Sequence, residues 1–309
     1  MSRPAEHVER FAPSPNGFLH LGHAFSAILA HDAARAAGGR FLLRIEDIDQ
    51  GRARPEYEQA IIEDLRWLGL RWDAPPMRQS QRMAVYARAL DDLRARGLLY
   101  PCACTRKDIA QALAAPQEVG GAMPALPDGR GPDGPPYPGT CRRMLPAPGA
   151  PVAWRLDMRA AIAALGGASA VGRLSMRELG AGPGGETGLL RLDPDWLIAR
   201  CGDVVLARKD VAASYHLAVV LDDAAQGVTH VTRGQDLFAA APLHRLLQAL
   251  FGLPVPVWRH HRLIRDAAGR RLAKRDRDAG LRELRAAGVT PGQIRRMLDL
   301  PPARQASPR

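Results

Sequence analysis

The 309-residue chain is poor in cysteine and in aromatic residues, and it has no long apolar run. Its four cysteines are too few for the disulfide framework of a small secreted domain. Aromatic residues make up only 5% of the chain, which disfavours binding of single-stranded nucleic acid through stacked bases. No apolar run approaches the roughly 18 residues that a membrane span requires, and the charged first ten residues do not resemble a signal peptide. We therefore expect a soluble, cytoplasmic protein that does not interact with membranes.

Positive charge is concentrated at one end of the chain. Lys and Arg together number 43 against 32 Asp and Glu, which gives a formal net charge of +11. Residues 259–309 hold thirteen Arg and one Lys against five acidic residues, so most of the excess lies there. This pattern indicates a polyanionic partner such as nucleic acid, or else an Arg-rich solvated surface without a function.

Strand and helix signals alternate along the chain, except between residues 114 and 151, where Pro and Gly dominate. Strands are expected at 8–12, 41–45, 152–156 and 228–232, and helices at 21–37, from Pro55 to a stop at Gly69, and at 242–250. The alternation predicts an α/β fold, a parallel sheet with helices on both faces.

The same pattern suggests four segments. Residues 1–100 and 191–255 are expected to form the two halves of a catalytic domain, separated by an insertion over 101–190. Residues 256–309 are expected to form a short, basic and mostly helical C-terminal region.

A candidate phosphate-binding motif follows the first predicted strand. His20 and His23, in the run HLGH, stand at a predicted helix start, where backbone N–H groups attract phosphate and paired His donors can stabilise developing charge. Gly22 between them lets a flat ring or a backbone approach closely. The alternative is that both histidines only cap the helix or lie on the surface. A P-loop is excluded, because the chain has no G-x-x-x-x-G-K-[ST] sequence.

Lys274 is a candidate catalytic residue by its scarcity, because the chain has 40 Arg and only three Lys. A mobile ammonium group can follow a phosphate as its geometry changes, whereas guanidinium is a rigid fork. The run at residues 270–276 is therefore either a catalytic loop or part of the basic surface.

Cys102, Cys104 and Cys141 form a candidate zinc site, with Tyr137 as an unusual fourth ligand. A metal would explain how a segment rich in Pro and Gly keeps a fixed structure without a core of its own. Otherwise the three are ordinary thiols. Cys201 lies apart from them and is expected to pack in the interior.

Glu46 and Arg233 each follow a predicted strand, at the edge where open parallel sheets bind ligands. A carboxylate and a guanidinium at this edge suit an amino-acid zwitterion. Taken singly, each residue could instead belong to a surface ion pair.

Five runs of sequence, in this order, resemble the class I glutamyl-tRNA synthetases. They are RFAPSP at 10–15, HLGH at 20–23, LRIEDID at 43–49, VTRGQDL at 231–237 and LAKRD at 272–276. The resemblance covers about residues 8–278 and implies the Rossmann-like sheet of that class, interrupted by an inserted, zinc-binding subdomain. Only 35 residues follow Lys274, so the chain is most similar to short members of the family that lack the large anticodon-binding region.

The resemblance also implies roles for individual residues. His20, Gly22 and His23 correspond to the HIGH motif and Lys274 to the ATP-binding lysine of the KMSKS loop, which keeps one of its two lysines here. The residues similar to the family's glutamate pocket are Arg10, Ala12, Ser14, Glu46, Tyr215 and Arg233. Glu46 is expected to meet the α-ammonium group, and the two arginines the side-chain carboxylate.

The cysteine cluster matches the structural zinc site of the short members, with Cys102, Cys104, Tyr137 and Cys141 as ligands. The 32 residues between Cys104 and Tyr137 are more than this resemblance leads us to expect.

The implied activity is a ligase that activates glutamate with ATP and Mg²⁺ in the absence of tRNA. The glutamyl group would pass to the queuosine base at the wobble position of tRNA(Asp), with the basic end holding the anticodon stem-loop through its phosphates. Two alternatives stay open: a truncated synthetase that charges the tRNA 3′ end, and a catalytically silent RNA-binding paralogue. A monomer is expected, because nothing in the sequence indicates an interface.

Overall fold

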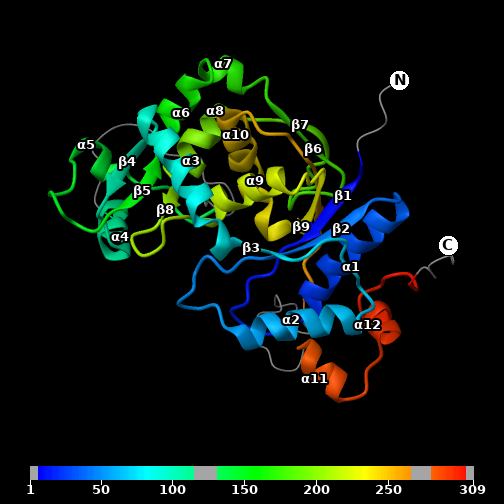
Figure 1. Cartoon of the computed structure of the whole chain (residues 1–309). Helices are drawn as coiled ribbons and strands as arrows, with labels where there is room; N and C mark the ends of the chain where they lie inside the picture. Colours follow the sequence, from blue (N-terminus) through cyan, green and yellow to red (C-terminus); the bar gives the residue numbers. More distant parts are fainter. Residues whose placement is uncertain (1–5, 115–130, 266–279, 304–309) are drawn as a thin grey trace.

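A computed structural model describes residues 6–114, 131–265 and 280–303. Two groups of strands form its central layer (Figure 1). The first is parallel, in the order β1-β2-β3, and comprises β1 (Val8–Phe11), β2 (Arg40–Ile45) and β3 (Met77–Arg78). The second has the order β7-β6-β10-β9 and comprises β6 (Ser175–Glu178), β7 (Gly188–Arg191), β9 (His230–Gly234) and β10 (Val257–His261). Strand β10 is parallel to β6 and β9, and β7 is antiparallel to β6.

Strands β1 and β9 lie side by side and join the two groups. The Thr229 amide donates to the Val8 carbonyl at 3.0 Å, and the Val8 amide donates to Thr229 Oγ1 at 2.8 Å. The combined strand order is therefore β3-β2-β1-β9-β10-β6. From β1 the next strands in sequence lie on one side, whereas from β9 the next strand lies on the other side, so the order of connection reverses between β1 and β9. In open α/β sheets such a reversal leaves a crevice at the carboxyl ends of the strands.

Helices cover both faces of this layer (Figure 1). On one face, α1 (Leu21–Ala36), α2 (Pro55–Trp67), α11 (Leu281–Ala286) and α12 (Pro291–Met297) share a core with β1 and β2. On the other face, the main helices are α3 (Met83–Ala95), α9 (Tyr215–Ala225) and α10 (Ala241–Phe251). Their apolar stripes pack together, so burial of side chains such as Leu217 and Leu246 holds this layer.

A second, antiparallel sheet has the order β4-β5-β8, and its middle strand lies in the expected insertion. Its strands are β4 (Leu99–Cys102), β5 (Ala153–Leu156) and β8 (Val205–Ala207). The helices of this part are α4 (Arg106–Ala114), α5 (Thr140–Arg143), α6 (Met158–Ala164), α7 (Gly167–Val171) and α8 (Pro194–Trp196). Because β6 lies between β5 and β8 in sequence but pairs with β10, the chain crosses between the two sheets more than once. The described residues also form two 3-10 helices, η1 (Gln79–Arg82) and η3 (Gln235–Ala240), and one π-helix, η2 (Leu197–Cys201).

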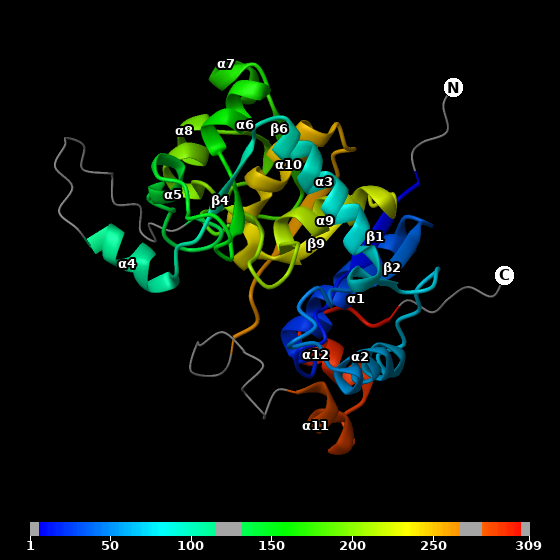
Figure 2. The same cartoon turned by 60° about the vertical axis from the view of Figure 1, so that its left-hand side comes forward.

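Helices α11 and α12 lie beside α2 and α1, on the side away from α4 and α5 (Figures 1 and 2). Arg295 of α12 is buried and donates two hydrogen bonds to Asp32 of α1, at 2.7 and 3.0 Å. Arg285 of α11 lies 3.4 Å from the buried Asp64 of α2. Part of the basic charge at this end therefore attaches the two helices to the sheet domain.

The described elements agree with most of the expected ones. The expected strand at 228–232 begins two residues later, at His230, and ends at Gly234. The expected strand at 152–156 is β5, which belongs to the antiparallel sheet. None of the helices in the described part of the chain is both long and apolar enough to cross a membrane.

Candidate active site and cysteine cluster

A cavity of about 380 Å³ opens where the strand order reverses. Its lining comes from the ends of β1 and β9, the start of α1, and residues that follow β2 and β10. Nine of the ten residues expected to bind glutamate or ATP line it: Arg10, Ala12, Ser14, His20, Gly22, His23, Glu46, Tyr215 and Arg233. The tenth, Lys274, lies outside the described residues, as does the rest of its loop from 266 to 279. The structure thus brings together residues that are up to 223 positions apart in the sequence, from Arg10 to Arg233.

His20 and His23 cap helix α1 and also line the cavity. The His20 ring accepts a hydrogen bond from the Gly22 amide through Nδ1 at 3.0 Å, and the His23 ring accepts from the His20 amide through Nδ1 at 3.2 Å. In a neutral imidazole the other nitrogen then carries the hydrogen, so each Nε2–H is a donor. The capping and ligand-binding interpretations of the motif are therefore compatible.

Gly22 is required by the position of the His20 ring. A Cβ atom at Gly22 would lie 2.9 Å from Cε1 and 3.1 Å from Nδ1 of that ring. Any side chain here would have to displace the ring that caps the helix.

Arg10 and Glu46 line one part of the cavity, and Arg44 and Asp223 are buried behind them; we call these four residues the carboxylate wall. Asp223 of α9 accepts from Arg10 Nε at 3.0 Å and from Arg44 Nη1 at 2.6 Å. Arg44 Nη2 lies 3.4 Å from Glu46 Oε1. Burial acts to raise the pKa of Asp223, but the two guanidinium groups lower it overall. Burial raises the pKa of Glu46, against the opposing effect of Arg44.

A second group places Arg233 on the cavity surface, with the buried rings of His244 and His260 behind it; we call these three residues the imidazole wall. Arg233 donates from Nε to His260 Nε2 at 2.9 Å and from Nη1 to His244 Nδ1 at 3.2 Å. Its Nη1 also lies 3.4 Å from the Tyr215 hydroxyl. Its Nη2 is buried and has no hydrogen-bond partner. Among the described residues, no carboxylate oxygen lies within 4.0 Å of this guanidinium.

Neither Glu46 nor Arg233 belongs to a surface ion pair. Arg233 is only 6% exposed, and burial lowers its pKa. The Glu46 side chain is 11% exposed, and its nearest cation is the buried Arg44. A desolvated guanidinium with an unused N–H is strongly attractive to an anionic group that enters the cavity.

Sequence reasoning missed several side chains of the two walls, because they come from distant elements. Asp223, His244 and His260 were not expected to contribute. A signal did exist for two of them. Asp223 and His244 are polar residues in the apolar runs that become α9 and α10, and buried polar groups require partners.

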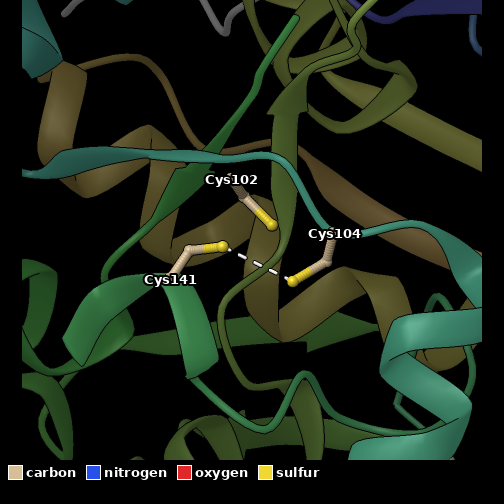
Figure 3. Close-up of side chains that lie close together, drawn as sticks. All are labelled: Cys102, Cys104 and Cys141. Atoms are coloured by element: carbon tan, nitrogen blue, oxygen red, sulfur yellow. Dashed lines mark hydrogen bonds between the residues drawn. The ribbon is translucent and has the colours of Figure 1, made fainter. Parts of the chain in front are cut away.

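The cysteine cluster lies in the insertion, where Cys102 ends β4, Cys104 follows this strand and Cys141 belongs to α5 (Figure 3). The three sulfur atoms lie within 4.8 Å of one another, and Cys104 Sγ is 3.4 Å from Cys141 Sγ. All four cysteines are free thiols, and Cys201 packs in the core away from the cluster. Ordinary scattered thiols are therefore ruled out for Cys102, Cys104 and Cys141.

Tyr137 completes the cluster with an oxygen atom. Its hydroxyl lies 3.4 Å from Cys102 Sγ and 3.2 Å from Cys104 Sγ, and it accepts from the Cys141 amide at 2.9 Å. The Arg155 guanidinium stacks on the Tyr137 ring, 3.8 Å from its centroid, whereas burial and hydrogen bonds with the three cysteines raise the pKa of the Tyr137 hydroxyl. Burial acts to raise the pKa of Cys141, but hydrogen bonds involving Tyr137 and Cys104 lower it to about 7. Three thiols and one phenol in this arrangement could hold a metal ion.

Comparison with known proteins places the chain in a family. The family model described as tRNA synthetases class I (E and Q), catalytic domain, matches residues 7–126 and 195–301. A glutamyl-Q tRNA(Asp) synthetase of Rhodobacter capsulatus is 54% identical over 297 residues, covering 95% of this chain and 100% of that protein. The chain belongs to the glutamyl-Q tRNA(Asp) synthetase family. A second protein of that name, from Symbiobacterium thermophilum, is 42% identical and covers 92% of this chain and 83% of its own length.

Two solved structures give the same fold at lower identity. The crystal structure of a glutamate-tRNA synthetase from Elizabethkingia anophelis superposes with a TM-score of 0.66 at 27% identity, covering 88% of this chain. That of a glutamate tRNA ligase from Elizabethkingia meningosepticum in complex with its amino acid gives a TM-score of 0.65 at 28% identity over 89% of this chain. The chain spans 53% of the length of each of these two proteins.

Membership of the glutamyl-Q tRNA(Asp) synthetase family makes the chain a ligase with the class I catalytic fold. The parallel sheet is the one expected for that class, and the cavity lies at the point where its strand order reverses.

Proposed function

We propose that the chain activates glutamate with ATP in the absence of tRNA and then transfers the glutamyl group to the queuosine base of tRNA(Asp). The observation that carries the proposal is the unpartnered Nη2 of Arg233, on a buried guanidinium that lacks a carboxylate. Such a group needs an anion in the cavity, and glutamate has one at the end of its side chain.

Glutamate would bind between the two walls. Arg233 and Arg10 would hold the side-chain carboxylate, with the Tyr215 hydroxyl beside them. Glu46 would accept from the α-ammonium group, and Ala12 and Ser14 would line the space beside it. This arrangement would leave the α-carboxylate directed towards the start of α1.

ATP would bind at that helix start. The Nε2–H groups of His20 and His23 and the positive end of the helix dipole would stabilise the α-phosphate, beside the surface at Gly22. The α-carboxylate of glutamate attacks the α-phosphorus, and the bond to pyrophosphate breaks. Lys274 would follow the phosphates, and Mg²⁺ bound with ATP would neutralise part of their charge. No catalytic base is needed, because the nucleophile is already an anion.

The second step would transfer the glutamyl group from the adenylate to the queuosine base, with release of AMP. The basic C-terminal region would hold the anticodon stem-loop through phosphates, so binding should weaken steeply with salt. Arg285 and Arg295 are already used to attach α11 and α12, so other arginines of residues 259–309 would make these contacts.

The cysteine cluster would bind one structural zinc ion. Cys102, Cys104, Cys141 and Tyr137 would be its four ligands, and zinc would favour their deprotonated forms. The ion would fix the end of β4 against α5, whose described residues share only a small apolar cluster.

Two assays test this function in sequence. Glutamate-dependent ATP–pyrophosphate exchange is measured first without tRNA, followed by transfer of labelled glutamate to tRNA(Asp) with and without queuosine. Exchange together with queuosine-dependent transfer supports the proposal. Exchange only with tRNA(Glu) indicates a truncated synthetase, and no exchange under any condition indicates a silent RNA-binding paralogue.

A further inference from the structure

Arg233 stands at the centre of a chain of hydrogen bonds that reaches two distant carboxylates. On one side it contacts His244, whose Nε2 lies 3.0 Å from His216 Nδ1, and His216 Nε2 lies 3.0 Å from Asp133 Oδ1. On the other side it contacts His260, which leads to Glu178. We call the first side the long arm.

On the second side, the short arm, the series of hydrogen bonds reaches a carboxylate after one ring. His260 Nδ1 lies 2.6 Å from Glu178 Oε2, and the other oxygen of Glu178 accepts from the backbone amides of His260 at 2.8 Å and Gly180 at 2.7 Å. Glu178 is fully buried, so its orientation is fixed from both sides.

The direction of every bond follows from the guanidinium. Arginine has donors only, so the ring nitrogens that contact it, His244 Nδ1 and His260 Nε2, must be acceptors without hydrogen. The opposite nitrogen of each neutral ring then carries the hydrogen and donates outward. In the long arm this gives His244 to His216 and His216 to Asp133. In the short arm it gives His260 to Glu178, so all the contacts agree on one set of tautomers.

The rings hold the guanidinium without cancelling its charge. A carboxylate in direct contact would fix Arg233 equally well, but it would occupy the same N–H groups and neutralise the site. Asp223 does this for Arg44. With neutral rings between, the terminal carboxylates select the tautomers, while the charge of Arg233 stays available in the cavity. Burial lowers the pKa of both His244 and His260, which keeps both rings neutral.

We propose that His244 and His260, with His216, Asp133 and Glu178 behind them, are positioning residues that present Arg233 as an uncompensated cation and so select glutamate over glutamine. This inference rests on the proposed function for the identity of the substrate. It also gives part of the Pro- and Gly-rich insertion a role, because Asp133 lies within it and ends the long arm.

The test compares two substitutions at one position, His244→Asn and His244→Asp. Both side chains place an oxygen near the former Nδ1, so both can accept from Arg233, and they have nearly the same size. Only Asp adds a negative charge, because an adjacent guanidinium keeps it ionised. The dissociation constants for L-glutamate and L-glutamine are measured by isothermal titration calorimetry, alongside ATP–pyrophosphate exchange. The same pair of changes at His31, on α1 outside the cavity, is the matched control.

The expected result is a wide separation between the two variants. His244→Asn should weaken glutamate binding only a few-fold, whereas His244→Asp should weaken it by a further 10- to 100-fold or so, the usual effect of losing a charge-assisted bond. Glutamine binding should change much less, so the preference for glutamate should fall in the Asp variant. Equal glutamate affinities for the two variants would overturn the proposal, since a merely structural ring would not distinguish them.

Asp133→Asn provides a second test that does not depend on a buried substitution, because the Asp133 side chain is 56% exposed. Loss of the terminal charge, two rings away from Arg233, should raise KM for glutamate by about two- to fivefold with kcat unchanged, because outer partners orient the groups that contact the ligand. Unchanged KM would exclude the long arm. Failure of the proposed function gives a different result: wild-type protein would then show no glutamate-dependent exchange, while the calorimetric comparison would still decide whether the rings tune the charge of Arg233.

Discussion

The two walls of the cavity each contain a buried arginine, and the difference between them shows how the site divides its charges. Arg44, in the carboxylate wall, is fully buried and is bonded to Asp223 at 2.6 Å and to Gln226 at 3.0 Å. Arg233, in the imidazole wall, is nearly as buried, but its hydrogen-bond partners are two imidazole rings and the Tyr215 hydroxyl. The first arginine is neutralised by the protein itself, whereas the second is left to be neutralised by a ligand.

The comparison also explains why one wall should control stability and the other activity. A buried charge whose partner is removed is strongly destabilising, whereas a buried cation without an anionic partner already bears its desolvation cost in the folded protein. Substitutions in the carboxylate wall should therefore mainly lower the free energy of unfolding. Substitutions in the imidazole wall should mainly lower the rate of glutamate activation.

The largest effect is expected from Arg233→Gln in glutamate activation. Removal of the guanidinium should lower kcat/KM for glutamate by about 10²- to 10⁴-fold, because two charge-assisted hydrogen bonds to the substrate are lost. ATP–pyrophosphate exchange measures the loss. Arg191→Gln, the same change on the exposed end of strand β7, is the control and should retain full activity. A loss below tenfold would mean that Arg233 does not bind the substrate.

The next largest effect is expected from Arg44→Met in stability. Asp223 would lose its 2.6 Å partner and keep only Arg10, so the free energy of unfolding should fall by about 3–5 kcal/mol. Urea denaturation measures this change. Arg233→Gln should cost less than about 1.5 kcal/mol in the same experiment, since no buried carboxylate loses a partner. Equal losses for the two variants would remove the distinction between the walls.

The metal site should respond independently of both walls. Wild-type protein is expected to contain about one zinc per chain, and Cys141→Ser to retain less than about half of it after dialysis, because a thiolate ligand is lost. Elemental analysis gives the metal content. Cys201→Ser should keep the full content, since Cys201 lies outside the cluster. A wild-type protein that is free of zinc yet fully stable and active would refute the site.

The smallest effect concerns the attachment of α12 outside the cavity. Burial acts to raise the pKa of Asp32, but hydrogen bonds involving His31 and Arg295 lower it to about 2 from the ordinary 3.8. The ion pair with Arg295 therefore adds stability above pH 3.8 that is lost as the pH falls towards 2. Since Asp32 is 36% exposed, solvent screening reduces this contribution to about 1 kcal/mol.

Urea unfolding of Asp32→Asn tests this attachment at two pH values. The variant should be less stable than wild type at pH 7 and nearly equal to it near pH 2. Asp91→Asn, which removes an exposed carboxylate 3.3 Å from Arg94, should change little at either pH. A difference for Asp32→Asn that persists at pH 2 would assign it to packing rather than to charge.

Local patterns in the sequence predicted the elements near the cavity well. The strand, loop and helix around His20 and the strand before Glu46 follow from apolar spacing and from Pro and Gly positions. The expected residues at 10–23, 46 and 233 converge because the carboxyl ends of parallel strands meet at one edge.

What the sequence could not show depends on long-range contacts. The rings around Arg233 come from β10 and α10, and their carboxylates from β6 and the insertion, so no local spacing relates them. Net charge did not indicate which arginines are available to contact phosphate, for a different reason. A count of arginines cannot separate Arg295, which is buried against Asp32, from a residue that is free to contact phosphate.

The most direct test of the central claim is calorimetric titration of the wild-type protein and of Arg233→Gln with L-glutamate and L-glutamine. If Arg233 is an uncompensated cation that selects the side-chain carboxylate, wild type should bind glutamate at least about 100-fold more tightly than glutamine, and the substitution should remove most of this preference. Equal binding of the two amino acids by wild type, or a preference that survives the loss of the guanidinium, would contradict the account.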